Sequence, residues 1–143
     1  MTTLPDWLTV WDHTADEGIV VRAETRPLLY ARAAEGMFRL LLDVDAVDGR
    51  QTREVEVSAD DPEMLMANWL SELNYLHQAR RLAFGRFEVT SAGERRLTAR
   101  VGGEPLDPVR HRLRTEIKAV TLHRLRVAFT PDGVWEATVL FDL

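Results

Sequence analysis

Cysteine is absent from the 143-residue chain, and so are long hydrophobic runs. The first absence excludes disulfides, thiolate zinc sites and cysteine nucleophiles, without fixing the redox compartment. No apolar run approaches the roughly 18 residues that a membrane span needs. The N-terminal residues lack the basic segment and apolar core of a secretory signal. We therefore expect a cytoplasmic protein that does not contact a membrane.

Lysine is nearly absent too, because Lys118 is the single lysine among 18 basic residues, and the net charge is −5. A protein that grips nucleic acid directly usually has a concentrated basic face. The densest basic stretch consists of Arg110, Arg112, Arg114, Lys118, Arg124 and Arg126. In a β conformation these residues would alternate onto one face. That face would either bind RNA phosphates or, in the plainer interpretation, form a solvated sheet surface.

The motifs of common enzyme classes are also missing. The chain has no Walker-type phosphate loop and no glycine fingerprint of a dinucleotide-binding fold. None of its serines, Ser58, Ser71 and Ser91, lies in a Gly-x-Ser-x-Gly elbow. A Ser–His–Asp mechanism therefore has little support.

The composition that is present is ordinary for a globular protein and predicts one domain over residues 1–143. Alternating or β-branched segments predict strands over 7–14, 17–24, 53–59, 84–90, 96–101, 115–121, 123–130 and 134–141. Apolar spacing predicts a helix over 27–43 and a second one, capped at Asp60, that ends near Arg81. A break is expected over 102–105. Together these elements indicate an α+β fold, a largely antiparallel β-sheet with two helices packed on one face.

Acidic residues cluster from Asp12 to Glu17, in the turn between the first two predicted strands. Closely spaced carboxylates can supply the oxygens that hard divalent cations need, although a solvated acidic loop has the same pattern. His13 in this turn is, by itself, more typical of a hydrogen-bonded structural histidine. At the other end, Asp142-Leu143 places a side-chain carboxylate next to a terminal one. This pair is either a further cation donor or a strand that simply ends at a sheet edge.

A third polar group comprises Glu104, His111, Glu116, Lys118 and His123. Glu116 and Lys118 are two residues apart, so they would share a face of a strand. Histidine, glutamate and lysine together can perform acid–base chemistry. A cross-strand ladder of ion pairs is the alternative that we favour from the residues alone.

Taken together, these segments resemble the archease family. The resemblance rests on Asp12–Gly18 near the start, Glu116–His123 late in the chain and Asp142-Leu143 at its end. Gly103-Glu104 and the segment Asn68–Leu70 support it. It covers essentially the full length of the chain.

The resemblance implies an accessory protein that is not an enzyme and has no catalytic residues. Archeases activate the RtcB-type RNA ligase, which joins tRNA exon halves through a guanylylated histidine intermediate. The implied role is to promote guanylylation of the ligase and multiple turnover in tRNA splicing or RNA repair. RNA would be contacted at most indirectly.

The resemblance also implies a bound divalent metal ion, expected to be calcium. Its implied ligands are Asp16, Asp142 and Leu143, the last through a backbone or terminal oxygen. The residues implied to surround the metal or to contact the partner are Asp12, His13, Glu104, Lys118 and His123.

Two positions depart from the family pattern. Glu17 stands where the family usually has an apolar residue, and Thr121-Leu122-His123 lacks the tyrosine of the usual Thr-Tyr-His. Two alternative functions remain open. A metal-dependent hydrolase or phosphotransferase would use the same acidic cluster with His13 or His123 as general base. An RNA-binding module would use the basic residues between 110 and 126.

Overall fold

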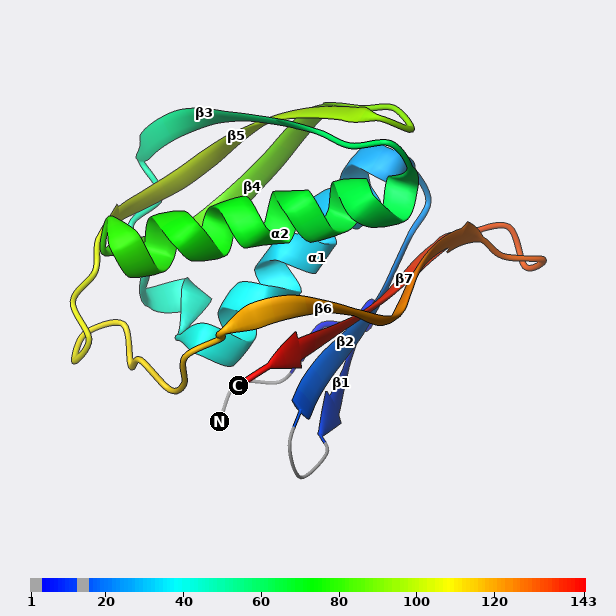
Figure 1. The fold of residues 1–143 in the computed structure, drawn as a ribbon. Helices are drawn as coiled ribbons and strands as arrows, with labels where there is room; N and C mark the ends of the chain where they lie inside the picture. Colours follow the sequence, from blue (N-terminus) through cyan, green and yellow to red (C-terminus); the bar gives the residue numbers. More distant parts are fainter. Residues whose placement is uncertain (1–3, 13–15) are drawn as a thin grey trace.

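The computed structural model describes residues 4–12 and 16–143, with the backbone alone at Asp12 and Asp16 (Figure 1). The elements run in the order β1 (Leu8–Asp12), β2 (Asp16–Ala23), α1 (Arg26–Leu41), the 3₁₀ turn η1 (Val44–Ala46), β3 (Gln51–Ser58), α2 (Pro62–Ala79), β4 (Leu82–Ala92), β5 (Arg96–Pro105), β6 (Ala119–Phe129) and β7 (Trp135–Asp142). No helix within these ranges combines the length and the hydrophobicity needed to cross a membrane.

The strands form two antiparallel sheets, in the orders β1-β2-β7-β6 and β3-β5-β4. Both helices lie between the sheets (Figure 1): α1 contacts β4 and β2, and α2 contacts β3 and β6. The predicted α+β class is confirmed, with one difference. The strands divide into two sheets where one was expected, so each helix buries two faces and not one.

Side-chain caps and apolar spacing explain where the helices begin. The hydroxyl of Thr25 accepts the N–H of Leu28, and Pro27 occupies the first turn of α1, where no intrahelical N–H is needed. Helix α2 is capped by Asp61, whose carboxylate accepts the N–H of Met64 over 2.7 Å. The predicted cap at Asp60 is therefore off by one residue. The residue before a proline favours an extended backbone, which suits the capping position at Asp61.

The sequence Gly102-Gly103 lies inside β5, and the break expected over 102–105 is wrong. A Cβ at Gly102 would overlap the carbonyl oxygen of Gly49, and one at Gly103 would overlap that of Ala83. The two glycines thus allow neighbouring backbone to approach the strand closely, and the strand continues.

The segment before β6 also differs from expectation. Residues 113–118 are not in a strand, and the two predicted strands over 115–121 and 123–130 are one strand, β6. Ile117 is fully buried, and its carbonyl oxygen accepts an N–H of the Asn74 side chain on α2 over 2.9 Å. Its backbone is therefore satisfied by the helix instead of by a neighbouring strand.

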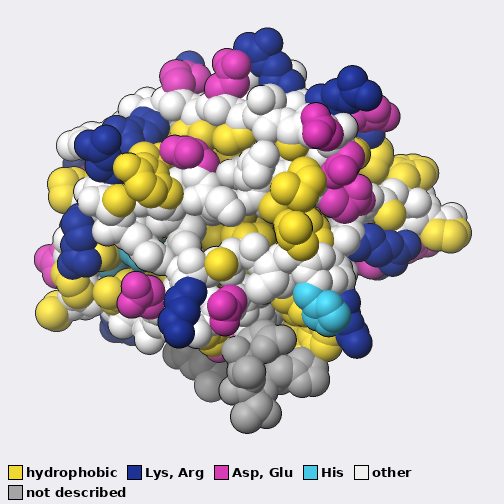
Figure 2. Space-filling view, in the orientation of Figure 1, with side chains coloured by type: hydrophobic (Ala, Val, Ile, Leu, Met, Phe, Trp, Pro, Cys, Tyr) yellow, Lys and Arg dark blue, Asp and Glu magenta, His cyan; other side chains and the backbone are white. Residues whose placement is uncertain are grey.

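The basic residues between 110 and 126 do not form the single face that a strand would give. Arg110 pairs with Glu104, and the Arg114 guanidinium donates to the carbonyl oxygen of Arg39 over 2.7 Å. On the face seen in Figure 2, basic and acidic side chains are interspersed. The expectation of a basic strand face is wrong because most of this segment is a loop folded against η1 and the end of α1.

Candidate functional site

The register of the first sheet brings the two predicted acidic ligands together. Asp16, at the start of β2, is the direct partner of Asp142, at the end of β7. Directly opposed residues of an antiparallel pair belong to the same face of the sheet. On the neighbouring pair of strands, Asp12 stands opposite Glu17. His13 lies outside the described residues, so its predicted place near the metal stays a prediction.

Lys118 is fixed next to this acidic pair through its backbone. Its N–H donates to the carbonyl oxygen of Asp142 over 2.8 Å, and the following residue, Ala119, is the β6 partner of Asp142. The Lys118 side chain is exposed and forms no ion pair with the side chains that the structure describes. The structure therefore presents this ammonium to solvent beside Asp142.

Helix α2 supplies the residues that hold Lys118 in place. The side-chain amides of Asn74 and Gln78 both donate to the carbonyl oxygen of Ile117. Asn74 is 7% exposed and Ile117 is fully buried, so this connection is internal. Sequence reasoning missed both amides because it treated α2 as a core helix. Two amide side chains at i and i+4, on one face of an otherwise apolar helix, were the available signal.

Leu143 and His123 occupy different surroundings. Leu143 follows Asp142 directly and is partly buried against the core. His123 is exposed within an irregular part of β6, where the pairing with β7 shifts between Thr121 and Arg126. The β6 residue that stands opposite Asp142 is Ala119, and His123 comes four residues after Ala119 in the chain. Leu122, at the position of the family's tyrosine, is 61% exposed.

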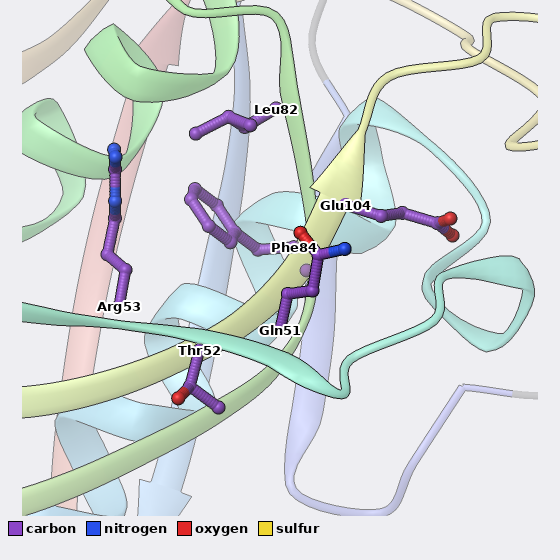
Figure 3. Close-up of a pocket in the computed structure, with 7 residues that line it drawn as sticks. Gln51, Thr52, Arg53, Leu82, Phe84 and Glu104 are labelled. Carbon is purple, nitrogen blue, oxygen red and sulfur yellow. The ribbon is translucent and has the colours of Figure 1, made fainter.

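Glu104 lies in the other sheet, at the end of β5, and its carboxylate is engaged within the fold. It accepts two N–H bonds from Arg110 (2.7 and 3.0 Å), one from the backbone of Asp48 (2.7 Å) and one from His111 (2.9 Å). These donors, the Arg110 guanidinium first among them, lower the pKa of Glu104 to about 2. In Figure 3 its side chain points away from Phe84 and Leu82, which line a hollow of about 160 Å³.

The bonds of His111 determine which of its ring nitrogens carries hydrogen. Nδ1 accepts the backbone N–H of Asp107 over 2.9 Å, so Nε2 carries the hydrogen and donates to Glu104. The ring is fully buried. The third polar group is thus divided: Glu104 and His111 form one internal network, while Glu116, Lys118 and His123 lie elsewhere. Among the described side chains, only Glu104 and His111 of this group are in contact, so neither the predicted acid–base group nor the predicted cross-strand ladder of ion pairs is formed.

The donors at the end of the first sheet suit a hard cation in their chemistry. Carboxylates are the ligands that calcium prefers, and the β2–β7 register opposes two acidic residues one position before Leu143. Among the described residues, no three or more histidine or acidic side chains lie close enough together to hold a metal. His13 and the side chains of Asp12 and Asp16 are not among these residues. The fit therefore rests on the backbone register and the donor type.

Comparison with known proteins gives a consistent result. The model of the archease protein family matches residues 9–143. The protein archease of Thermococcus gammatolerans is 39% identical over 137 residues, covering 93% of this chain and 96% of that protein. The one from Methanosarcina mazei is 37% identical over 136 residues, covering 92% of each.

Comparison with solved structures gives the same result as the comparison of sequences. The solution structure of protein 1598 from Methanobacterium thermoautotrophicum superimposes with a TM-score of 0.82 at 30% identity, covering 96% of this chain and 99% of that one. A Thermotoga maritima crystal structure, described as an archease and possible chaperone, shares the fold with a TM-score of 0.55 at 21% identity, over 100% and 98% of the two chains. By its family model, its relatives and its fold, the chain belongs to the archease family.

Proposed function

We propose that this protein is an accessory activator of an RtcB-type RNA ligase in the cytoplasm. It promotes guanylylation of the ligase and multiple turnover in tRNA splicing or RNA repair, and it performs no catalysis itself. The observation that carries this proposal is family membership over residues 9–143. A supporting observation is that His111 and Glu104, two members of the polar group that could have performed acid–base chemistry, use their polar atoms in hydrogen bonds within the fold.

The surface that we assign to ligase contact is the end of the first sheet where Lys118 and Asp142 meet. Both side chains are exposed, as is Glu116, two residues before the lysine. Their backbone is anchored by the Lys118–Asp142 hydrogen bond and by the buried Ile117. An exposed charged group on a rigid support loses little conformational entropy on binding, which suits a contact with a partner or with its phosphate-bearing substrate.

A divalent cation, calcium in our proposal, belongs to this surface. Asp16, Asp142 and an oxygen of Leu143 would hold it, with Asp12 and His13 nearby. When bound, the cation would neutralise carboxylates whose mutual repulsion otherwise opposes their ionisation. The chain's own residues supply the frame, since the β2–β7 register fixes Asp16 opposite Asp142.

The test is a ligation assay with the cognate ligase, GTP, a divalent metal and RNA halves in excess over the ligase. Sub-stoichiometric amounts of this protein should raise the number of joining events per ligase molecule. A ligase turnover that is identical with and without the protein contradicts the proposal. A reaction with this protein alone is the control, and cleavage or phosphate release there would favour the metal-dependent hydrolase.

A further inference from the structure

A contact between an arginine and a tryptophan joins the two edge strands of the β1-β2-β7-β6 sheet. The guanidinium carbon of Arg124 on β6 lies 5.4 Å from the centre of the Trp11 ring on β1, within the range of a cation–π interaction. Strands β7 and β2 separate these edges in the sheet order (Figure 1). The contact therefore connects opposite sides of the sheet.

The contact lies on the sheet face that points away from the helices. Trp11 is the partner of Gly18, and Gly18 alternates along β2 with Ile19, which is fully buried in the core beneath the helices. Continuing across the sheet, Gly18 is opposite Leu140, and Leu140 is opposite Thr121. Trp11 thus begins a row of residues that crosses all the strands of this sheet.

This outer row is packed. Leu140 is 4% exposed although it faces away from the helices, and a Cβ at Gly18 would overlap its Cδ2 atom. Glycine at position 18 therefore lets the leucine side chain lie flat over β2. The residues of this row are thus packed together, and the contact between Arg124 and Trp11 joins the two edges of the sheet.

The irregularity of β6 allows Arg124 to reach Trp11. Between the pairs Thr121–Leu140 and Arg126–Thr138, residues 122–125 of β6 stand against residue 139 alone of β7. Arg124 itself has a φ of 56°, in the left-handed region that is unfavourable for a residue with a side chain. Bulges in β-strands commonly redirect a side chain in this way.

The row next to this one contains Asp16 and Asp142. Each is two residues along its strand from Gly18 or Leu140, a spacing of about 6.7 Å. We propose that Arg124, acting through Trp11, is a positioning residue for this acidic end. It holds the β1–β2 hairpin against β7 and so sets the affinity of the acidic pair for a divalent cation. The second part rests on the cation site of the proposed function.

Hydrogen exchange followed by mass spectrometry tests the contact without any metal. In metal-free protein, R124Q should speed amide exchange in peptides that cover residues 8–20, by about two- to fivefold, the change that an exposed cation–π contact corresponds to. R124K, which keeps the cation, should exchange more slowly than R124Q. R126Q removes the same charge from the same strand and is the matched control. Equal exchange in R124Q and R126Q overturns the contact.

Calorimetric titration with calcium chloride tests the consequence. R124Q should raise the calcium Kd by a similar two- to fivefold factor, whereas R126Q should leave it unchanged. Faster exchange with an unchanged Kd overturns the positioning role. If the unmodified protein binds no calcium, the cation site of the proposed function fails and the positioning role fails with it, while the exchange measurement still decides whether the contact exists.

Discussion

The backbone N–H of Lys118 donates to the carbonyl oxygen of Asp142 over 2.8 Å, so the chain's single lysine is tied to the strand that carries the predicted metal ligand. The bond joins the loop before β6 to the end of β7. It leaves the lysine side chain free to contact a partner, because only the backbone is used. A change to the side chain should therefore separate partner contact from folding.

Substitution K118A should strongly reduce activation of the ligase and leave the melting temperature nearly unchanged. The side chain is exposed and forms no ion pair with the described side chains, so the fold loses little when it is removed. Multiple-turnover ligation and thermal unfolding are the two measurements. R126A is the control for loss of an exposed positive charge on β6. A large fall in melting temperature for K118A would instead mean that the lysine is structural.

Substitutions D16N and D142N should each abolish a calcium-dependent rise in melting temperature. In the proposed site, calcium binds the folded state alone, which stabilises it by about 2.7 kcal/mol at a hundredfold excess over the Kd. Thermal unfolding with and without calcium chloride measures the effect. The control is D132N. Asp132 lies in the turn before β7, at the opposite end of that strand from Asp142, so this variant should keep the full calcium response. Calcium responses equal to the parent's in both D16N and D142N would show that the site is misassigned.

The sequence was sufficient for the elements whose signals are local. The helices, their proline starts and the β4–β5 hairpin follow from apolar spacing and turn residues within short windows. The division into two sheets and the path of residues 113–118 depend on partners distant in sequence. The carbonyl of Ile117 finds the amide of Asn74, and no local pattern encodes that choice.

The same distinction applies to the candidate site. The acidic residues at positions 12–17 and at 142 were evident, but their meeting required β2 and β7 to be neighbours, which a single sequence does not specify. The sequence grouped Glu104 with His111, which do contact each other, but it did not identify Arg110 as their neighbour. Arg110 and His111 reach it through a loop whose turns, including a left-handed Arg112, set the approach.

Substitution G102A should destabilise the fold by about 1–3 kcal/mol, the usual cost of forcing extra atoms into a packed region. The new Cβ would overlap the backbone carbonyl of Gly49, which no side-chain rotation can relieve. Urea unfolding measures the difference. G93A is the control, because the nearest atom to its Cβ is 4.0 Å away, and its stability should stay within about 0.5 kcal/mol of the parent's. Equal stability of the two variants would contradict the close approach.

Substitution E104Q should destabilise the protein at neutral pH, and the difference should shrink in acid. The pKa of Glu104 in the folded state is lowered from its usual 4.5 to about 2 by Arg110, by the backbone N–H of Asp48 and by His111. A lowered folded-state pKa means that the unfolded chain takes up the proton first as the pH falls. The stabilisation is therefore fully present above pH 4.5 and is lost progressively between pH 4.5 and 2. Urea unfolding midpoints of the parent and E104Q should be far apart at pH 7 and should converge toward pH 2. E116Q, at an exposed glutamate that forms no ion pair with the described side chains, should show a small difference throughout. A gap between the parent and E104Q that stays constant down to pH 2 would mean that shape, and not the charge of Glu104, holds the loop from Asp107 to His111 in place.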